Sequence, residues 1–401
     1  MLAEESRQAE RDLYDESWLP AERQDTRLPQ EHPINFDHWM LREMHEQPQS
    51  LAATLDQYVD ATGFRQSAVA PIREWLRGDT ELLIAASGSS RHAGLVAQAA
   101  IEAESTLRVT VEFASEYGFR DVRAQAQAGV VVISQSGETA DTLAALRLAA
   151  ERGHRTLAIT NVPTSTMARE ADVSMPVAAG RERAVPATKS FTGQLLVLRL
   201  LSLLAAQEGL SEEQVDKQLN DLRALPGVIA AQLQGWPVAA KAAADRFCDA
   251  SSFLFLGRGI HFPIASEGAL KLKESAYIHA EGYPAGELKH GPNALVSESA
   301  PLVFVATYDP TDASSVTRHE KDLLLLHDMR EQGAGIIALG NTGDTAVAEL
   351  ADVFLPVDPV SETLLPICEV VPLQFLAYYF AIGKGIDVDR PRNLVKAVVV
   401  E

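Results

Sequence analysis

The sequence is poor in cysteine and has no long apolar run. Its two cysteines, Cys248 and Cys368, lie far apart and form no CxxC pair, which argues against a disulfide framework or a thiolate metal site and favours the reducing cytosol. No uninterrupted apolar run approaches the roughly 20 residues that cross a bilayer. The first residues also lack the basic-then-apolar order of a signal peptide. We therefore expect a soluble cytoplasmic protein without a membrane partner.

Positive charge is scarce as well. Lysine and arginine number 35 against 55 aspartates and glutamates, a formal net charge of −20. Such a charge repels a polyphosphate backbone, so nucleic-acid binding is disfavoured and any anionic ligand must be captured locally. The 401 residues, 46% apolar and 22% charged, are typical of a globular protein with two or three domains.

The chain divides into five segments by composition. Residues 1–35 form an acidic, polar tail, and apolar residues at near-helical spacing predict a helical lead-in over 36–77. From there short apolar strands alternate with longer helical patterns, which predicts parallel sheets covered by helices. We place one α/β domain at 78–235, a second at 236–385 and a C-terminal tail at 386–401.

The order of predicted strands and two local sequence matches indicate that the two α/β domains arose by duplication. Strands are predicted at 82–86, 130–133 and 157–160, and again at 253–256, 302–306 and 336–339, with a long helical stretch over 193–246 between the copies. Two local identities share the offset of 180 residues: ERGHRTLAITN from Glu151 matches EQGAGIIALGN from Glu331, and Ala171-Asp172-Val173 matches Ala351-Asp352-Val353. The alternative is that any two apolar α/β segments look alike.

Two hydroxyl-rich loops follow predicted strands of the first copy. Ligands of open parallel sheets bind beyond the carboxyl ends of the strands, where helix N-termini offer unpaired N–H groups. Neither loop is a GxGxxG or Walker sequence, so a small phosphate monoester fits better than a dinucleotide or nucleoside triphosphate. The competing interpretation is that these serines simply cap helices. The loop residues are Ser87, Gly88, Ser89 and Ser90, then Ser134, Gln135, Ser136 and Thr139.

The second copy has Arg258 and the run Thr307-Tyr308-Asp309 at the corresponding strand ends, so we expect it to contribute catalytic groups instead. Charged residues are dense between Glu267 and Pro292. On a helix, Glu267, Lys271 and Glu274 project from one face because their spacings are four and three. They form either a solvated face with salt bridges or the base and cation that sugar isomerisation needs, with His290 held on a constrained turn.

Four motifs are typical of one known family. They are SQSGETADTLAALRL from Ser134, EGALKLKE from Glu267, YIHAEGYPAGELKHGP from Tyr277 and DVDRPRNLVK from Asp387. From Phe36 onward the chain resembles the isomerase half of glutamine–fructose-6-phosphate aminotransferase and its relatives with sugar-isomerase (SIS) domains. The resemblance implies an α/β fold of two tandem flavodoxin-like SIS domains, each a parallel sheet with helices on both faces.

The resemblance also implies roles for individual residues. Glu274 would move a proton between C1 and C2, with Lys271 assisting at the hydroxyls, and Lys396 would form a Schiff base with the open ketose. His290 would open the sugar ring from a neighbouring subunit, which implies a homodimer. No metal or redox cofactor is implied. The residues expected to bind the sugar phosphate are Ser87, Gly88, Ser89, Ser90, Ser134, Gln135, Ser136, Thr139 and Val185.

Departures from the family pattern leave the substrate open. Leu2 follows Met1 where the family's glutaminase half has its catalytic cysteine, so we expect free ammonia, or ammonia from a separate glutaminase, instead of glutamine. Ser87 replaces a family cysteine, Ala187 replaces a substrate-contacting serine, and Pro186 stiffens that loop.

The leading expectation is an amino-sugar phosphate isomerase/deaminase that converts glucosamine 6-phosphate to or from fructose 6-phosphate and ammonia. One alternative is an isomerase or deaminase for another sugar phosphate, of the galactosamine or fructosamine type. The other is a non-catalytic sugar-phosphate sensor, against which the presence of Glu274, His290 and Lys396 argues.

Overall fold

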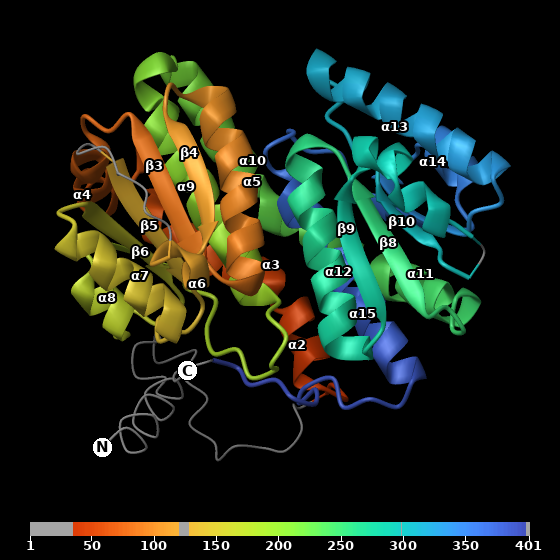
Figure 1. Cartoon of the computed structure of the whole chain (residues 1–401). Coiled ribbons are helices and arrows are strands. Elements are labelled where there is room, and N and C mark those ends of the chain that lie inside the picture. The colour runs from red at the N-terminus through yellow and green to blue at the C-terminus, as the bar shows by residue number, and fades with distance from the viewer. Residues whose placement is uncertain (1–34, 120–127, 298, 398–401) are drawn as a thin grey trace.

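The computed structural model describes residues 35–119, 128–297 and 299–397. Two α/β units lie side by side, with α5 of the first and α12 of the second facing each other between the two sheets (Figure 1). The acidic tail expected over residues 1–35 lies, apart from Asn35, outside the described residues.

The first unit is a five-stranded parallel sheet with the order β4-β3-β5-β6-β7. Its central strands are almost wholly apolar and buried, as strands covered on both faces must be. One face packs against α5 and α9, and the other against α6, α7 and α8. The strands are β3 (Glu81–Ala86), β4 (Arg108–Phe113), β5 (Ala128–Ser134), β6 (Arg155–Thr160) and β7 (Val173–Pro176); the helices are α5 (Gly88–Glu104), α6 (Ala114–Tyr117), α7 (Ala140–Glu151), α8 (Thr166–Glu170) and α9 (Lys189–Ala206).

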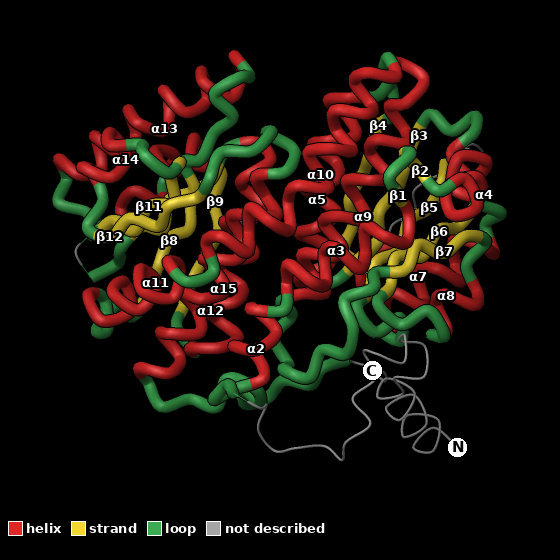
Figure 2. The backbone as a smooth tube through the Cα atoms, turned by 180° about the vertical axis from the view of Figure 1, so that it is seen from behind, coloured by secondary structure: helices red, strands yellow, loops and turns green. Residues whose placement is uncertain are grey.

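The second unit repeats this topology with the order β12-β11-β10-β8-β9, again all parallel. Helices α11, α12 and α15 cover one face, and α13 and α14 cover the other (Figure 2). The elements are α11 (Gly235–Arg246), β8 (Ser252–Gly257), α12 (Phe262–Ala276), β9 (His279–Pro284), β10 (Leu302–Val305), α13 (Ala313–Glu331), β11 (Ile336–Asn341), α14 (Thr345–Leu350), β12 (Val353–Val357) and α15 (Leu365–Gly383).

Both sheets place their strands in the chain order 2-1-3-4-5, the flavodoxin-like arrangement. The predicted α/β fold with two flavodoxin-like units is therefore confirmed. A detail of the hydrogen bonding matches the sequence offset of 180: Asp172 accepts from the backbone N–H of Thr156 at 2.7 Å, and Asp352 accepts from that of Ile336 at 2.8 Å.

Further helices precede the first sheet and link the two units. The segment 36–77 folds into three helices joined in part by a short hairpin, and the stretch between the units forms α10 in addition to α9 and α11. These elements are α2 (Trp39–His45), α3 (Gln47–Tyr58), β1 (Val59–Asp60), β2 (Gly63–Phe64), α4 (Gln66–Leu76), η2 (Gln207–Gly209) and α10 (Glu212–Gln232).

Among the residues that the structure describes, two helices are long and apolar enough, by length and composition alone, to cross a membrane. They are Lys189–Gly209 and Leu365–Gly383, and 89% of the tested window of each is buried inside the protein. Both pack as central helices of their domains, α9 against α5 and α15 against α12. Their apolar character is accounted for by these core positions.

A charged network fills the strand ends of the second unit, where the first unit has its hydroxyl loops. His261, at the end of η3 (Gly259–His261) and just before α12, lies fully buried between Glu369 Oε1 at 2.6 Å and Glu362 Oε1 at 3.0 Å. Glu362 also accepts from Ser315 Oγ at 2.6 Å and from Arg318. The network therefore ties the start of α12 to the loop before α15.

Protonation of His261 stabilises this network. Burial alone would lower the pKa of His261, but the carboxylates of Glu369 and Glu362 outweigh burial and raise the pKa to about 9. The folded chain thus keeps a proton that the unfolded chain, with its ordinary histidine pKa of 6.5, releases. The stabilisation is complete below pH 6.5 and is lost as the pH rises towards 9.

We predict that the free energy of unfolding falls by a few kcal/mol between pH 6.5 and 9. Burial raises the pKa of Glu43 to about 8, so the chain also loses stability through Glu43 as the pH rises. The measurement therefore compares the unaltered chain with His261→Gln in denaturant titrations across this pH range. The difference between the two curves isolates His261 and should shrink with rising pH. Parallel curves would contradict the prediction.

Candidate functional site

The hydroxyl loops lie at the switch point of the first sheet. Strands β3 and β5 are neighbours, with Ala86 opposite Ile133 in the register, and their connections lead in opposite directions along the sheet. Ser87 follows β3 and Ser134 ends β5, so the two loops start side by side. In this sheet topology the carboxyl ends at the switch point form the ligand crevice.

The loop after β5 gathers three hydroxyls. Ser134 Oγ lies 2.8 Å from Thr139 Oγ1 and 3.3 Å from Ser136 Oγ. Gly137 permits this tight turn: it has φ +68°, and a Cβ there would lie 2.1 Å from Ser165 Oγ. The turn therefore holds three hydroxyls together at the end of β5, where the sequence predicts a phosphate.

The loop hydroxyls differ in whether they bond backbone N–H groups. Ser134 Oγ accepts from the Gly137 N–H and Ser136 Oγ from the Glu138 N–H, both at 3.1 Å. Ser87 is the N-cap of α5 and Thr139 is the N-cap of α7, yet neither side chain makes a capping hydrogen bond. The Thr139 hydroxyl instead contacts Ser134 Oγ at 2.8 Å, and a hydroxyl at a helix start that makes no capping bond can also donate to a ligand.

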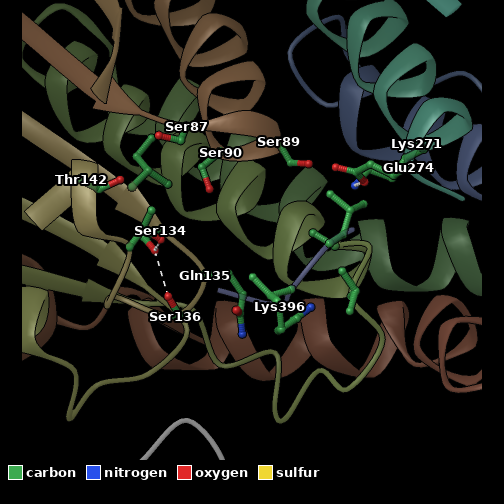
Figure 3. Close-up of a pocket in the computed structure, with 16 residues that line it drawn as sticks. Ser87, Ser89, Ser90, Ser134, Gln135, Ser136, Thr142, Lys271, Glu274 and Lys396 are labelled. Carbon is green, nitrogen blue, oxygen red and sulfur yellow. Dashed lines mark hydrogen bonds and ion pairs between the residues drawn. The ribbon is translucent and has the colours of Figure 1, made fainter. Parts of the chain in front are cut away.

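These loops line a cavity of about 170 Å³ between the two domains. In Figure 3 most serines of the first domain lie on the left, Lys271 and Glu274 lie on the right with Ser89 between the two groups, and Gln135 and Lys396 lie in the lower centre. Most of the predicted site residues thus share one cavity. Its lining consists of Ser87, Ser89, Ser90, Ile133, Ser134, Gln135, Ser136, Thr139, Thr142, Val185, Ala187, Lys271, Glu274, Leu394, Val395 and Lys396.

Helix α12 supplies a buried charge cluster to the cavity wall. Lys271 Nζ lies 2.6 Å from Glu274 Oε2 and 3.4 Å from Glu267 Oε1. The side chains of Glu267 and Lys271 are 0% and 1% exposed, so the solvated-face alternative is wrong. Burial opposes the charge on Lys271, but the carboxylates of Glu274 and Glu267 prevail and raise its pKa above the ordinary lysine value.

Glu267 also connects α12 to the first domain. Its carboxylate accepts from Ser89 Oγ at 2.8 Å and lies 2.8 Å from His92 Nδ1, both on α5. Burial would raise the pKa of Glu267, but Lys271, His92 and Ser89 together hold it below its ordinary value. The Ser89 hydroxyl, predicted to hold phosphate, is thus engaged across the domain boundary while still lining the cavity.

The C-terminal tail crosses the cavity and is fixed at several points. Asp389 accepts from the backbone N–H groups of Trp39 and Met40, both at 2.8 Å, and so caps α2. The Arg392 N–H donates to Tyr277 Oη at 2.6 Å, and its guanidinium lies 4.3 Å from the centre of that ring. Tyr277 ends α12 in the left-handed conformation, with φ 54°.

These anchors bring Lys396 into the site. Its amine donates to Glu182 Oε2 at 2.5 Å and to the Ala184 carbonyl oxygen at 2.7 Å, and its side chain is 13% exposed. Burial would raise the pKa of Glu182, but Lys396 and the surrounding donors lower it to about 2. Lys396 is therefore held as part of the site and is not a freely exposed charge.

Comparison with known proteins identifies the two α/β units. The SIS domain profile matches residues 76–204 and 247–383. The chain belongs to the SIS-domain family. Glutamine–fructose-6-phosphate aminotransferase from Chlorobaculum tepidum is 41% identical over 369 residues, a match that covers 91% of the chain and 59% of that protein. The chain therefore spans less than two thirds of the length of such relatives.

Solved structures agree with this assignment of two SIS domains. The C-terminal domain of glucosamine-fructose-6-phosphate aminotransferase from Francisella tularensis matches with a TM-score of 0.82 and 36% identity, over 89% of this chain and 99% of that one. Glucosamine-6-phosphate deaminase from Thermotoga maritima matches with a TM-score of 0.69 and 25% identity, over 90% of this chain and 100% of that one.

Two predicted residues do not line the cavity. Gly88 is the first residue of α5 and has φ +54°. His290, in the second SIS domain, is exposed at the end of η4 (Ala285–His290), which η5 (Pro292–Leu295) follows. Within the described parts of the chain, no group of three histidine, cysteine, aspartate or glutamate residues is arranged to hold a metal ion.

Other residues of the site escaped the sequence analysis. Glu182 and His92 belong to no predicted set, although each directly contacts a predicted residue. Glu182 stands three residues before Val185 in a loop without strand or helix pattern. Its proximity in sequence to Val185 was the only signal that could have indicated it.

We predict that Ser136→Ala combined with Thr139→Ala weakens the binding of fructose 6-phosphate and of inorganic phosphate by a few kcal/mol. Each lost charge-assisted hydrogen bond contributes about 1.5 to 3 kcal/mol. Isothermal titration calorimetry measures the change. The matched control is Ser314→Ala with Thr317→Ala, which removes the same groups from an exposed face of α13. Equal affinities in both folded double variants would exclude these hydroxyls from the phosphate site.

Proposed function

We propose that the chain interconverts glucosamine 6-phosphate with fructose 6-phosphate and ammonia in the cavity between its SIS domains. The observation that carries this proposal is the position of the Lys396 amine, which lines the same cavity as Glu274 and the hydroxyl loops. The candidate nucleophile Lys396, the candidate base Glu274 and the hydroxyls expected to bind phosphate thus line one small cavity. The names of the Francisella tularensis and Thermotoga maritima relatives point to the same two sugars.

The hydroxyl loops would hold the phosphate. Ser134, Ser136 and Thr139 present neutral donors at the start of α7, and the helix dipole favours a negative charge there. These local hydroxyl donors would bind a phosphate monoester in spite of the acidic net charge of the protein. The sugar carbons would then extend towards α12 and the tail.

Glu274 is the candidate base for the proton shift between C1 and C2. It lines the cavity with its side chain 23% exposed, and the Lys271 ammonium contacts it at 2.6 Å. That ammonium offsets the charge of the Glu274 carboxylate and can also stabilise the oxygen of a developing enediol. A carboxylate that takes a proton from one carbon and returns it to the next performs aldose–ketose isomerisation.

Lys396 is the candidate nucleophile. Its neutral amine would attack the C2 carbonyl of the open ketose, forming a C=N bond and releasing the carbonyl oxygen as water. The tail anchors at Asp389 and Arg392 limit the conformational freedom of this lysine, so little entropy is lost when it reacts. Imine exchange with ammonia would then deliver nitrogen to C2, or remove it in the reverse direction.

One feature of the cavity lining favours an alternative sugar phosphate, such as galactosamine 6-phosphate, as the substrate. Ala187 lines the cavity where the family resemblance places a serine, so one hydroxyl that could read a sugar epimer is missing. An assay for products from glucosamine 6-phosphate, galactosamine 6-phosphate and fructose 6-phosphate, with and without ammonium, separates these substrates. A chain that binds all three but converts none would be a sensor.

We further propose that His290 acts in the cavity of a second copy of the chain. It is exposed and does not line its own cavity, whereas ring opening needs an acid–base group at the sugar. The active unit would then be a homodimer whose two sites each contain residues of both copies.

We predict that Lys396→Arg folds and binds sugar phosphate but loses most amino-sugar conversion. Arginine keeps the charge and the reach of lysine, yet it forms no imine under these conditions. Borohydride reduction with fructose 6-phosphate, followed by peptide mass spectrometry, should label Lys396 in the unaltered chain. Lys241→Arg, which changes an exposed lysine paired with Asp245, is the control. Near-normal turnover by Lys396→Arg would overturn the assignment.

We predict that two inactive variants restore activity when mixed. After dissociation and reassociation of His290→Ala with Lys396→Arg, half of the dimers are hybrids, and each hybrid has one site with both residues intact. The mixture should therefore recover about a quarter of the unaltered activity. If His290 acts in its own chain, every site carries a defect and the mixture stays inactive.

A further inference from the structure

The amine of Lys396 occupies a small cradle of acceptors. Its two partners are the Glu182 carboxylate at 2.5 Å and the Ala184 carbonyl oxygen at 2.7 Å. Both partners accept hydrogen bonds and one carries a full negative charge. This combination suits a positively charged nitrogen that has several N–H donors.

The cradle is held in place by groups other than Lys396. Glu182 Oε1 accepts from the backbone N–H of Thr188 at 2.9 Å and from that of Ser190 at 3.1 Å, and Oε2 accepts from Ser190 Oγ at 2.6 Å. Glu43, on α2, accepts from the Ala184 N–H at 3.4 Å and so supports the other half of the cradle. The acceptors therefore stay in position when the lysine moves.

Departure of Lys396 would leave a buried charge without its partner. The Glu182 side chain is 0% exposed, and a buried carboxylate that loses its counter-ion is strongly destabilised. Neighbouring lysines already have carboxylates: Lys189 lies 2.7 Å from Glu46, and Lys271 lies 2.6 Å from Glu274. A cation from solution would restore the balance.

We propose that Glu182 and the Ala184 carbonyl form a binding site for ammonium, or for the protonated amino group of the substrate, which opens when Lys396 reacts with the sugar. An ammonium ion has the head group that Lys396 places there, without its carbon chain. The site lies beside the cavity that Lys396 lines, so a nitrogen held in it would be close to C2. This inference rests on the proposed function for its role in turnover.

The chemistry balances without a further reactant. Ammonium in the cradle passes one proton to the imine nitrogen of Lys396, which yields free ammonia and an iminium. The ammonia adds to C2, and one proton moves from the new nitrogen to the lysine nitrogen. The bond from C2 to Lys396 then breaks, which leaves a protonated sugar imine and a neutral lysine amine. The reverse sequence releases ammonium into the cradle during deamination.

Truncation of Lys396 opens the site for a direct measurement. In Lys396→Ala the tail keeps its anchors at Asp389 and Arg392, so the variant should fold. We expect ammonium chloride to raise the Tm of Lys396→Ala in a saturable manner. Sodium chloride and tetramethylammonium chloride at equal concentration should not do so, because sodium is smaller and tetramethylammonium has no N–H donors. The unaltered chain, whose cradle is filled, should show no such selective rise.

A second substitution tests the acceptor. Lys396→Ala with Glu182→Gln should lose the ammonium response, whereas Lys396→Ala with Glu46→Gln, which removes a nearby carboxylate that pairs with Lys189, should retain it. Circular dichroism establishes that each variant is folded, and the ion selectivity of Lys396→Ala alone still decides the matter if the double variant with Glu182→Gln is unfolded. Equal responses to all three salts would overturn the site.

The two proposals fail in distinguishable ways. If ammonium selectively stabilises Lys396→Ala but the unaltered chain converts no amino-sugar phosphate, the cradle is a cation site and the proposed function is wrong. If the unaltered chain is active but Lys396→Ala shows no selective response, the function stands and the cradle is not the ammonium site. In the active chain, Glu182→Gln should raise the KM for ammonium at least tenfold while borohydride still traps the Lys396 adduct.

Discussion

The architecture of the site depends on the buried charge of Lys271. An ammonium without access to water is tolerated only with close carboxylates, and Glu267 and Glu274 supply them from the same face of α12. Glu267 is in turn held by Ser89 and His92 on α5. Glu267 therefore links the buried cation of the second SIS domain to α5 of the first, beside the cavity that Ser89 and Lys271 both line.

The C-terminal tail closes this cavity through interactions that are each local and modest. The Asp389 carboxylate caps α2, and the Tyr277 hydroxyl accepts a hydrogen bond from the Arg392 N–H. The Val185 N–H donates to the Asp389 carbonyl oxygen at 3.0 Å. Together they deliver the Lys396 amine to Glu182 with little freedom left to lose. The tail thus holds the Lys396 side chain in one position although the segment is neither helix nor strand.

The two SIS domains share a topology but use their strand ends differently. The first places hydroxyls at the switch point, where Ser87 and Thr139 make no capping bonds and line the cavity. The second fills the same place with His261, Glu369 and the neighbouring charges, which anchor the start of α12. The first domain thus has a cavity at its strand ends, whereas the corresponding place in the second is occupied by charged side chains.

The sequence by itself determined the two parallel sheets and the hydroxyl loops, since strand alternation, the offset of 180 residues and the loop composition are local patterns. It left Glu267, Lys271 and Glu274 undecided between a solvated face and a buried cluster, because helical spacing is the same in both. Only the tertiary structure buried that face and paired Lys396 with Glu182, 214 positions away in the chain. Burial and pairing over such separations are properties of packing, and no local pattern encodes them.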